Sequence, residues 1–302
     1  MKRPTIVWIL LGLIWGSTWL VIKLGLQDLP PFSFAGIRFL VASVPLGLLA
    51  LLRRKAMPRR GRDWGIMVAT GLLTFTVCYG LIFWGEDRIP VGLTSVLYTT
   101  QPLFGLFLAH VLLRDEPITL RRLGGVLLGI GGVVLLFSHE LSLSDPLALY
   151  GMSAILVSAL AAAASAVVIK RWGETIDPTW LAFVQMVGGF IPLLAVGGAI
   201  EGSPLLLRWT PLAWGALFYL AFVGSALPFV LYYWLLQRME ATKVQLIALL
   251  CTVVAVLLGG VVLHEELSWK TALGTVAVLV GLAVTTWPGA ARARRIPSGR
   301  CP

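Results

Sequence analysis

The residues of this sequence that could do chemistry lie inside long apolar runs. Arg38 is a cation within such a run, where a guanidinium is costly unless it faces protein or water. One hypothesis is that Arg38 attracts the carboxylate of a small ligand. The alternative is a structural pairing with a helix-end carbonyl or with an acid near a loop, such as Glu86.

Aromatic, hydroxyl and amide side chains recur at helical spacing in these runs. Trp15 and Trp19 are four positions apart and share a helix face, as do Tyr79 and Phe83. Aromatic faces with a few polar groups suit a small amphipathic ligand, although single stripes of this kind usually only pack. Because polar groups turned towards lipid would lack partners, we expect the set to line a cavity. The predicted lining is Trp15, Trp19, Arg38, Thr76, Tyr79, Phe83, Tyr98, Gln101, Gln185, Tyr233 and Gln245.

Catalytic and metal-binding patterns are not found. Cys78 and Cys251 lie in apolar runs, and His110 is the one histidine inside such a run. No H-E-x-x-H, G-x-S-x-G or Walker pattern occurs, so we predict no catalytic residue, no metal and no cofactor, and an intramembrane enzyme is only a distant alternative. All 14 Asp and Glu residues are expected at or near loops. No acid is expected at mid-membrane depth, so proton coupling through a carboxylate would have no candidate better than Glu86, near the end of a run.

The apolar runs predict an all-α polytopic membrane protein. Hydrophobic residues make up 58% of the chain and charged residues 13%, whereas soluble domains carry about 25% charged residues. The net charge of +10 does not indicate nucleic acid, because the basic residues sit in short loops between apolar runs. The ten predicted spans are 5–25, 32–52, 64–85, 91–113, 120–138, 147–169, 178–200, 210–237, 242–263 and 270–287.

Loop charges predict the orientation. If the N-terminus is cytoplasmic, Arg88, Arg208 and Lys270 are the loop cations on the outer side, and all other loop Lys and Arg are inside. We therefore expect a multi-pass protein of the inner membrane with both termini in the cytoplasm.

The sequence contains an internal repeat of one membrane unit. Val21-Ile22-Lys23 returns as Val168-Ile169-Lys170, and the run 111–116 returns at 261–266. The predicted units are 1–144 and 145–289, followed by a basic tail, 290–302. Because five spans is an odd number, the second unit would be inverted, with the ligand site between the two units.

Two features bear on motion and assembly. Pro102 removes a backbone hydrogen bond within the fourth span and predicts a kink, either gating or static. Gly125, Gly129 and Gly132 form a small-residue face that favours close helix packing. We expect a monomer, with a homodimer through this face as the alternative.

The motifs resemble a known family. They are Trp15-Gly16-Ser17, Arg38, Pro102, and Glu116 followed by Gly124 and Gly131; the second half keeps Glu266, Gly274 and Gly281 but has Gln185 opposite Arg38 and Thr252 opposite Pro102. With ten spans in two units, the chain resembles the EamA family of the drug/metabolite transporter superfamily, and is similar to bacterial exporters of amino acids, aromatic ones included. The resemblance implies a central cavity lined by spans 1, 3, 4, 6, 8 and 9 and exposed to each side in turn. It implies secondary export of small organic metabolites; import or facilitated transport of a nucleoside, sugar or organic acid is the alternative.

Overall fold

The computed structural model describes residues 2–53, 57–89, 91–113, 116–136, 146–203, 207–262 and 269–286. Regular structure in these ranges is helical throughout, which confirms the predicted all-α class. Glu266, the boundary at 144–145 and the tail 290–302 lie outside these ranges.

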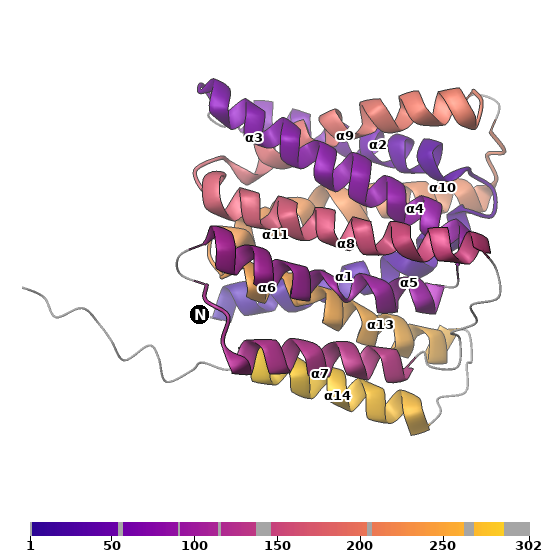
Figure 1. The fold of residues 1–302 in the computed structure, drawn as a ribbon. Coiled ribbons are helices and arrows are strands. Elements are labelled where there is room, and N and C mark those ends of the chain that lie inside the picture. Colours follow the sequence, from indigo (N-terminus) through magenta and orange to yellow (C-terminus); the bar gives the residue numbers. More distant parts are fainter. Residues whose placement is uncertain are drawn as a thin grey trace, which may run out of the picture.

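The helices run side by side in layers, with α7 and α14 paired at one edge (Figure 1). Their bounds are α1 Lys2–Gly25, α2 Pro31–Leu52, α3 Gly61–Gly71, η1 Leu72–Cys78, α4 Tyr79–Arg88, α5 Val91–Tyr98, α6 Gln101–Leu112, α7 Leu120–Leu136, α8 Pro146–Trp172, α9 Pro178–Ile200, α10 Pro211–Phe218, η3 Tyr219–Ala226, α11 Leu227–Leu236, α12 Ala241–Gln245, α13 Ile247–Val262 and α14 Trp269–Thr286.

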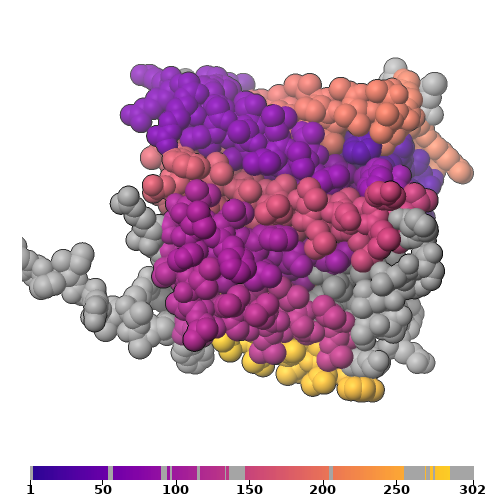
Figure 2. Space-filling view, viewed as in Figure 1, coloured from indigo at the N-terminus to yellow at the C-terminus, as the bar shows by residue number. Residues whose placement is uncertain are grey.

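Length and composition make this an integral membrane protein. Six helices of the described ranges are long and apolar enough to cross a bilayer, and shorter apolar helices accompany them. Large apolar side chains point outward, with Leu120 91% and Val111 78% exposed. Figure 2 shows one face of the molecule, on which α8 lies between the α3–α4 helix and α6. The molecule therefore presents apolar surface to lipid and keeps its hydroxyl and amide groups inside.

Two long helices contain π-helical segments, which the sequence analysis did not expect. η1 joins α3 to α4, and η3 joins α10 to α11. The segments begin at Leu72 and Tyr219, an offset of 147 positions, which equals the offset between Val21 and Val168 in the sequence repeat. A π-helix rotates the residues that follow it relative to a continuous α-helix, so it changes which side chains face inward.

Two other predicted spans are interrupted. Between α5 and α6 the helix breaks at Thr99 and Thr100, and Pro102 lies in the first turn of α6, where its missing N–H costs nothing. The second break, at Leu246, separates the short α12 from α13. Discontinuous helices of this kind place free backbone groups and polar side chains inside a bundle.

The small-residue face of α7 packs on α14. A Cβ added at Gly125 would lie 2.8 Å from the carbonyl oxygen of Gly281, and one added at Gly132 would lie 2.7 Å from that of Gly274. The close approach of the two backbones explains why glycine occupies these positions, and it gives the face a partner within the same chain.

Candidate functional site

A cavity lies between the long helices. It is lined by Trp15, Thr18, Trp19 and Ile22 of α1; Thr74 and Cys78 of η1; Tyr79 and Ile82 of α4; Ser95 and Tyr98 of α5; Gln101 of α6; Ala162, Ser165 and Ala166 of α8; Phe229, Tyr232 and Tyr233 of α11; Val244 and Gln245 of α12; and Ile247, Ala248, Cys251 and Thr252 of α13. None of these described lining residues is an acid, a lysine or an arginine. The cavity therefore offers aromatic surface, hydroxyls and amides, but no formal charge.

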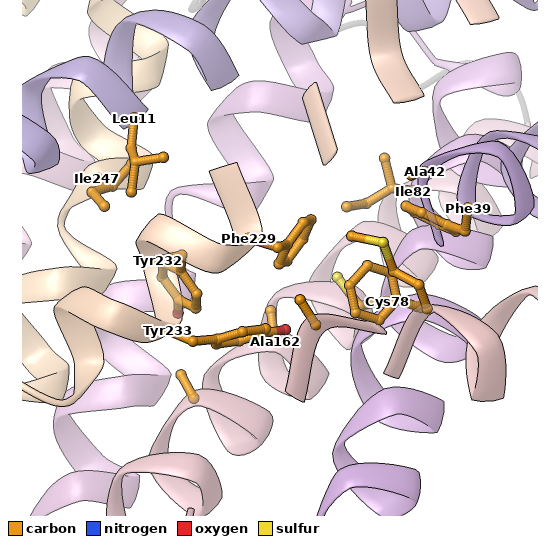
Figure 3. Packing of buried hydrophobic residues seen from close by; sticks show 14 of the residues in the cluster. Leu11, Phe39, Ala42, Cys78, Ile82, Ala162, Phe229, Tyr232, Tyr233 and Ile247 are labelled. Carbon is orange, nitrogen blue, oxygen red and sulfur yellow. The ribbon is translucent and has the colours of Figure 1, made fainter. Parts of the chain in front are cut away.

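Aromatic contacts build its walls. Trp15 packs against Phe229 and Tyr232 with ring centroids 5.4 and 5.3 Å apart, and its indole nitrogen donates to the Gly224 carbonyl at 3.1 Å. On the other side Trp19 meets Tyr98 edge to face at 5.4 Å. Figure 3 shows the rings of α11 together with Cys78 and Ala162. These contacts fix the ring planes and leave their faces for a flat or apolar ligand.

Gln245 brings an amide to this cavity. The residue is 1% exposed, and neither its amide oxygen nor its amide nitrogen has a hydrogen-bond partner. A Cβ at Gly105 would overlap this amide, so glycine there makes room for it against α6. The Tyr233 hydroxyl is likewise buried without a partner. Buried polar groups normally find partners, so these groups are available to a ligand.

Glu116 holds the helix that carries Gln245. Its buried carboxylate accepts hydrogen bonds from the backbone nitrogens of Ala241 and Thr242, at 2.6 and 2.9 Å, and from the Thr242 hydroxyl at 2.8 Å. This is a charged cap on the N-terminus of α12. Glu201 makes the corresponding contact on α2, accepting from the nitrogens of Phe32 and Ser33 at 2.8 Å each.

The structure gathers most of the predicted lining. Seven of the predicted side chains lie on the cavity: Trp15, Trp19, Tyr79, Tyr98, Gln101, Tyr233 and Gln245. Arg38, Thr76, Phe83 and Gln185 do not belong to the lining. Thr76 lies on the side of η1 that faces α9, where its hydroxyl donates to the Gly189 carbonyl at 3.2 Å, while Thr74 and Cys78 of the same segment line the cavity. Phe83 instead packs on Phe34 of α2, with centroids 5.3 Å apart.

Arg38 is fully buried against the second π-helix. Its Nε donates to the Ser225 hydroxyl at 2.8 Å, and one Nη donates to the Gly224 carbonyl at 3.3 Å. The guanidinium lies over the ring of Tyr79, 5.1 Å from the centroid, so this ring separates it from the cavity. These contacts fit the structural hypothesis for Arg38, which was pairing with a helix carbonyl. The carbonyl is that of Gly224, which lies in η3, within a helix.

Gln185 occupies a comparable place in the other half of the chain. It is 147 positions after Arg38, and its amide donates to the Thr70 hydroxyl at 2.5 Å. A Cβ at Gly71, the residue before η1, would lie 2.8 Å from the Gln185 Cα. Arg38 therefore packs beside η3, and Gln185 packs beside η1. In both cases the π-helical segment belongs to another span.

Several lining residues were not predicted from the sequence. Thr74 donates to Ser165 at 2.6 Å, and together they form a hydroxyl pair on the wall made by η1 and α8. Small polar residues in apolar helices usually bond to their own backbone, so nothing in their spacing marks them as lining. The alanine-rich stretch 161–164 was the available signal, because small side chains on one helix leave space beside it.

Comparison with known proteins gives matches along nearly the whole chain. The EamA-like transporter family model matches residues 3–138 and 149–287. The transporter YoaV of Bacillus subtilis is 28% identical over 91% of this chain and 94% of its own length. YedA of Escherichia coli, described as an inner membrane transporter, is 31% identical over 90% of this chain and 87% of its own.

Two further matches concern substrate and fold. A probable amino-acid metabolite efflux pump of Escherichia coli is 25% identical over 95% of both chains. A crystal structure covering 95% of this chain and 97% of its own superposes with a TM-score of 0.78 at 17% identity, which is a likeness of fold.

Proposed function

Because the chain belongs to the EamA-like transporter family, we propose that it is a secondary transporter that exports small organic metabolites, amino acids in the first place, by alternating access. The observation that carries the proposal is the cavity: it is enclosed by many helices, walled by aromatic rings and free of charged lining residues in the described ranges. Such a site suits a solute that is neutral overall, such as a zwitterion with an apolar side chain.

The proposed architecture is ten spans in two inverted five-helix units, 1–144 and 145–289. It is supported by the two ranges that the family model matches and by the common offset of the π-helices and of the pair Arg38 and Gln185. In this arrangement both termini are cytoplasmic, the substrate lies between the units, and Pro102 serves the gating of the fourth span.

The orientation can be tested by labelling. In the proposed topology Thr119 is cytoplasmic and Gly202 is external. Each of these residues lies in a loop that follows an apolar helix. Single cysteines at these positions, in a variant without Cys78, Cys251 and Cys301, should react with a membrane-impermeant maleimide from opposite sides. Reaction of both from the same side would refute the inverted arrangement.

Transport can be tested in proteoliposomes by counterflow with a panel of aromatic and aliphatic amino acids, nucleosides and organic acids. Ala162→Trp, which would fill the cavity, should abolish exchange. The matched control is Leu160→Trp on the outward face of the same helix, where the side chain is 43% exposed, and it should retain exchange.

The proposal fails if wild-type vesicles exchange no solute of the panel faster than protein-free vesicles. It also fails if Ala162→Trp transports as well as Leu160→Trp. Imposed gradients of pH and ions distinguish export from the alternative, a facilitator or importer, because the direction of secondary transport follows the gradients.

A further inference from the structure

Glu86 is an acidic residue fully buried inside a membrane-spanning helix. It lies in α4, which ends at Arg88, and its exposure is 0%, although the sequence analysis placed all acids at or near loops. Neither oxygen of its carboxylate has a hydrogen-bond partner. A buried carboxylate without donors is a costly feature, and in membrane proteins such groups usually have a functional role.

The other buried carboxylate of the described ranges shows what a structural acid looks like in this protein. Glu116 accepts three hydrogen bonds at the start of α12, and the half-buried Glu201 accepts two at the start of α2. Glu86 accepts none. It therefore does not cap a helix, and capping does not explain why an acid is placed there.

Two cations lie near Glu86 without bonding to its carboxylate. The Lys23 ammonium donates to the backbone carbonyl of Glu86 at 2.6 Å, and Arg38 attracts Glu86 electrostatically while one of its Nη atoms has no partner. A carboxyl group buried without hydrogen-bond donors, with two cations in its neighbourhood, is a place where a proton can bind and leave.

The position of Glu86 connects it to the cavity. Glu86 is four residues beyond Ile82, a lining residue of the same helix, and Tyr79, another lining residue, lies under the Arg38 guanidinium. Arg38 in turn is bonded to η3, which precedes the cavity rings of α11. A change in the charge of Glu86 therefore alters its attraction to a cation that is bonded to the segment before those rings.

We propose that Glu86 is the proton-binding residue that couples transport to the proton gradient, an inference that rests on the proposed transport function. When the site opens to the outside, a proton from water forms an O–H bond with one Glu86 oxygen. When it opens to the inside, this bond breaks, the proton passes to cytoplasmic water and the carboxylate returns. One proton therefore enters the cell in each cycle.

Other titratable groups lie on the same part of α4 and on the elements packed against it. α8 meets this part of α4 at Gly85, with Gly151 and Ile155, which carry no titratable group. The titratable groups of this region are Lys23 from α1, Arg38 from α2, Cys78 from η1, Tyr98 from α5, Tyr150 from α8 beside Gly151, and Tyr79, Asp87 and Arg88 of α4 itself.

Proteoliposomes test the proposal with the substituted carboxylate. Glu86→Gln should retain counterflow without any gradient, but lose both uphill transport driven by a pH gradient and the proton movement that an added solute causes. The matched control is Asp87→Asn, because Asp87 is adjacent, exposed and paired with Arg88, and all three activities should remain.

A second measurement uses the wild-type protein, so that it does not depend on how the variant folds. N,N′-dicyclohexylcarbodiimide reacts with protonated carboxyl groups inside membranes, and mass spectrometry should find its adduct on Glu86. Labelling should increase as the pH falls, and transport should be lost in parallel.

The outcomes separate the two proposals. If wild-type protein exchanges a solute but a pH gradient does not drive it, or a sodium gradient drives it instead, proton coupling is refuted and transport stands. Uphill transport by Glu86→Gln, or active protein without an adduct on Glu86, refutes the role of this residue. If no solute is exchanged at all, both proposals fall.

Discussion

The carboxylate cap on α12 should control both stability and substrate affinity. Glu116→Ala removes the acceptor of two buried backbone N–H groups and one hydroxyl, on Ala241 and Thr242. A buried donor that loses its partner costs about 1–3 kcal/mol, so the two N–H groups alone predict a loss of about 2–6 kcal/mol. Glu116→Gln keeps one acceptor oxygen and should lose about half of this.

The same substitution should weaken substrate binding, because α12 has only five residues and carries Gln245 at its end. Fraying of its first turn would displace this amide from the cavity, which should raise the KM for exchange more than it lowers the maximal rate at temperatures where the variant is folded. Gln245→Ala should raise the KM in the same way, and adding Glu116→Gln to it should raise the KM little further.

The assays are thermal unfolding of the purified protein and initial rates of counterflow. Glu174→Ala is the matched control, because that carboxylate is 52% exposed and pairs with Lys170 just beyond the end of α8. A surface pair of this kind contributes about 0.2–1 kcal/mol, so its loss should have a small effect. If Glu116→Ala unfolds at the same temperature as Glu174→Ala, the reasoning about the cap is wrong.

Three further predictions concern packing and the cavity. Gly281→Ala should lower the free energy of unfolding by about 1–3 kcal/mol, since its Cβ would meet the α7 backbone. Gly124→Ala, with open space around it, should raise the free energy of unfolding by about 0.5–1 kcal/mol, and thermal unfolding measures both changes. Arg38→Ala leaves buried acceptors without their donor, so we expect the yield of folded protein and transport to fall together, with a loss of about 2–4 kcal/mol; normal unfolding with lost transport would instead favour a direct role in substrate binding. Trp19→Ala or Tyr98→Ala breaks an aromatic pair of the cavity wall and should change which solutes compete in counterflow, while identical competition profiles would remove these rings from the site.

Much of the fold and part of the candidate site could be predicted from the sequence. The all-α membrane class follows from composition, because a bilayer admits a helix only where about 20 apolar residues occur in sequence. The close packing of Gly125 and Gly132 follows from a local spacing, and so does the set of rings that includes Trp15, Trp19 and Tyr98. Each of these predictions rests on spacing along a single helix.

The tertiary structure decided what depends on other helices. In η1, Thr74 lines the cavity, whereas Thr76 lies on the side of α9 and donates to the Gly189 carbonyl. Arg38 finds its partner 187 positions away, and Glu86 is withdrawn from water by helices from distant parts of the chain. A sequence shows that an acid or a base lies near the end of an apolar run, but its exposure and partners are set only when the helices pack, because solvation is a property of the whole assembly.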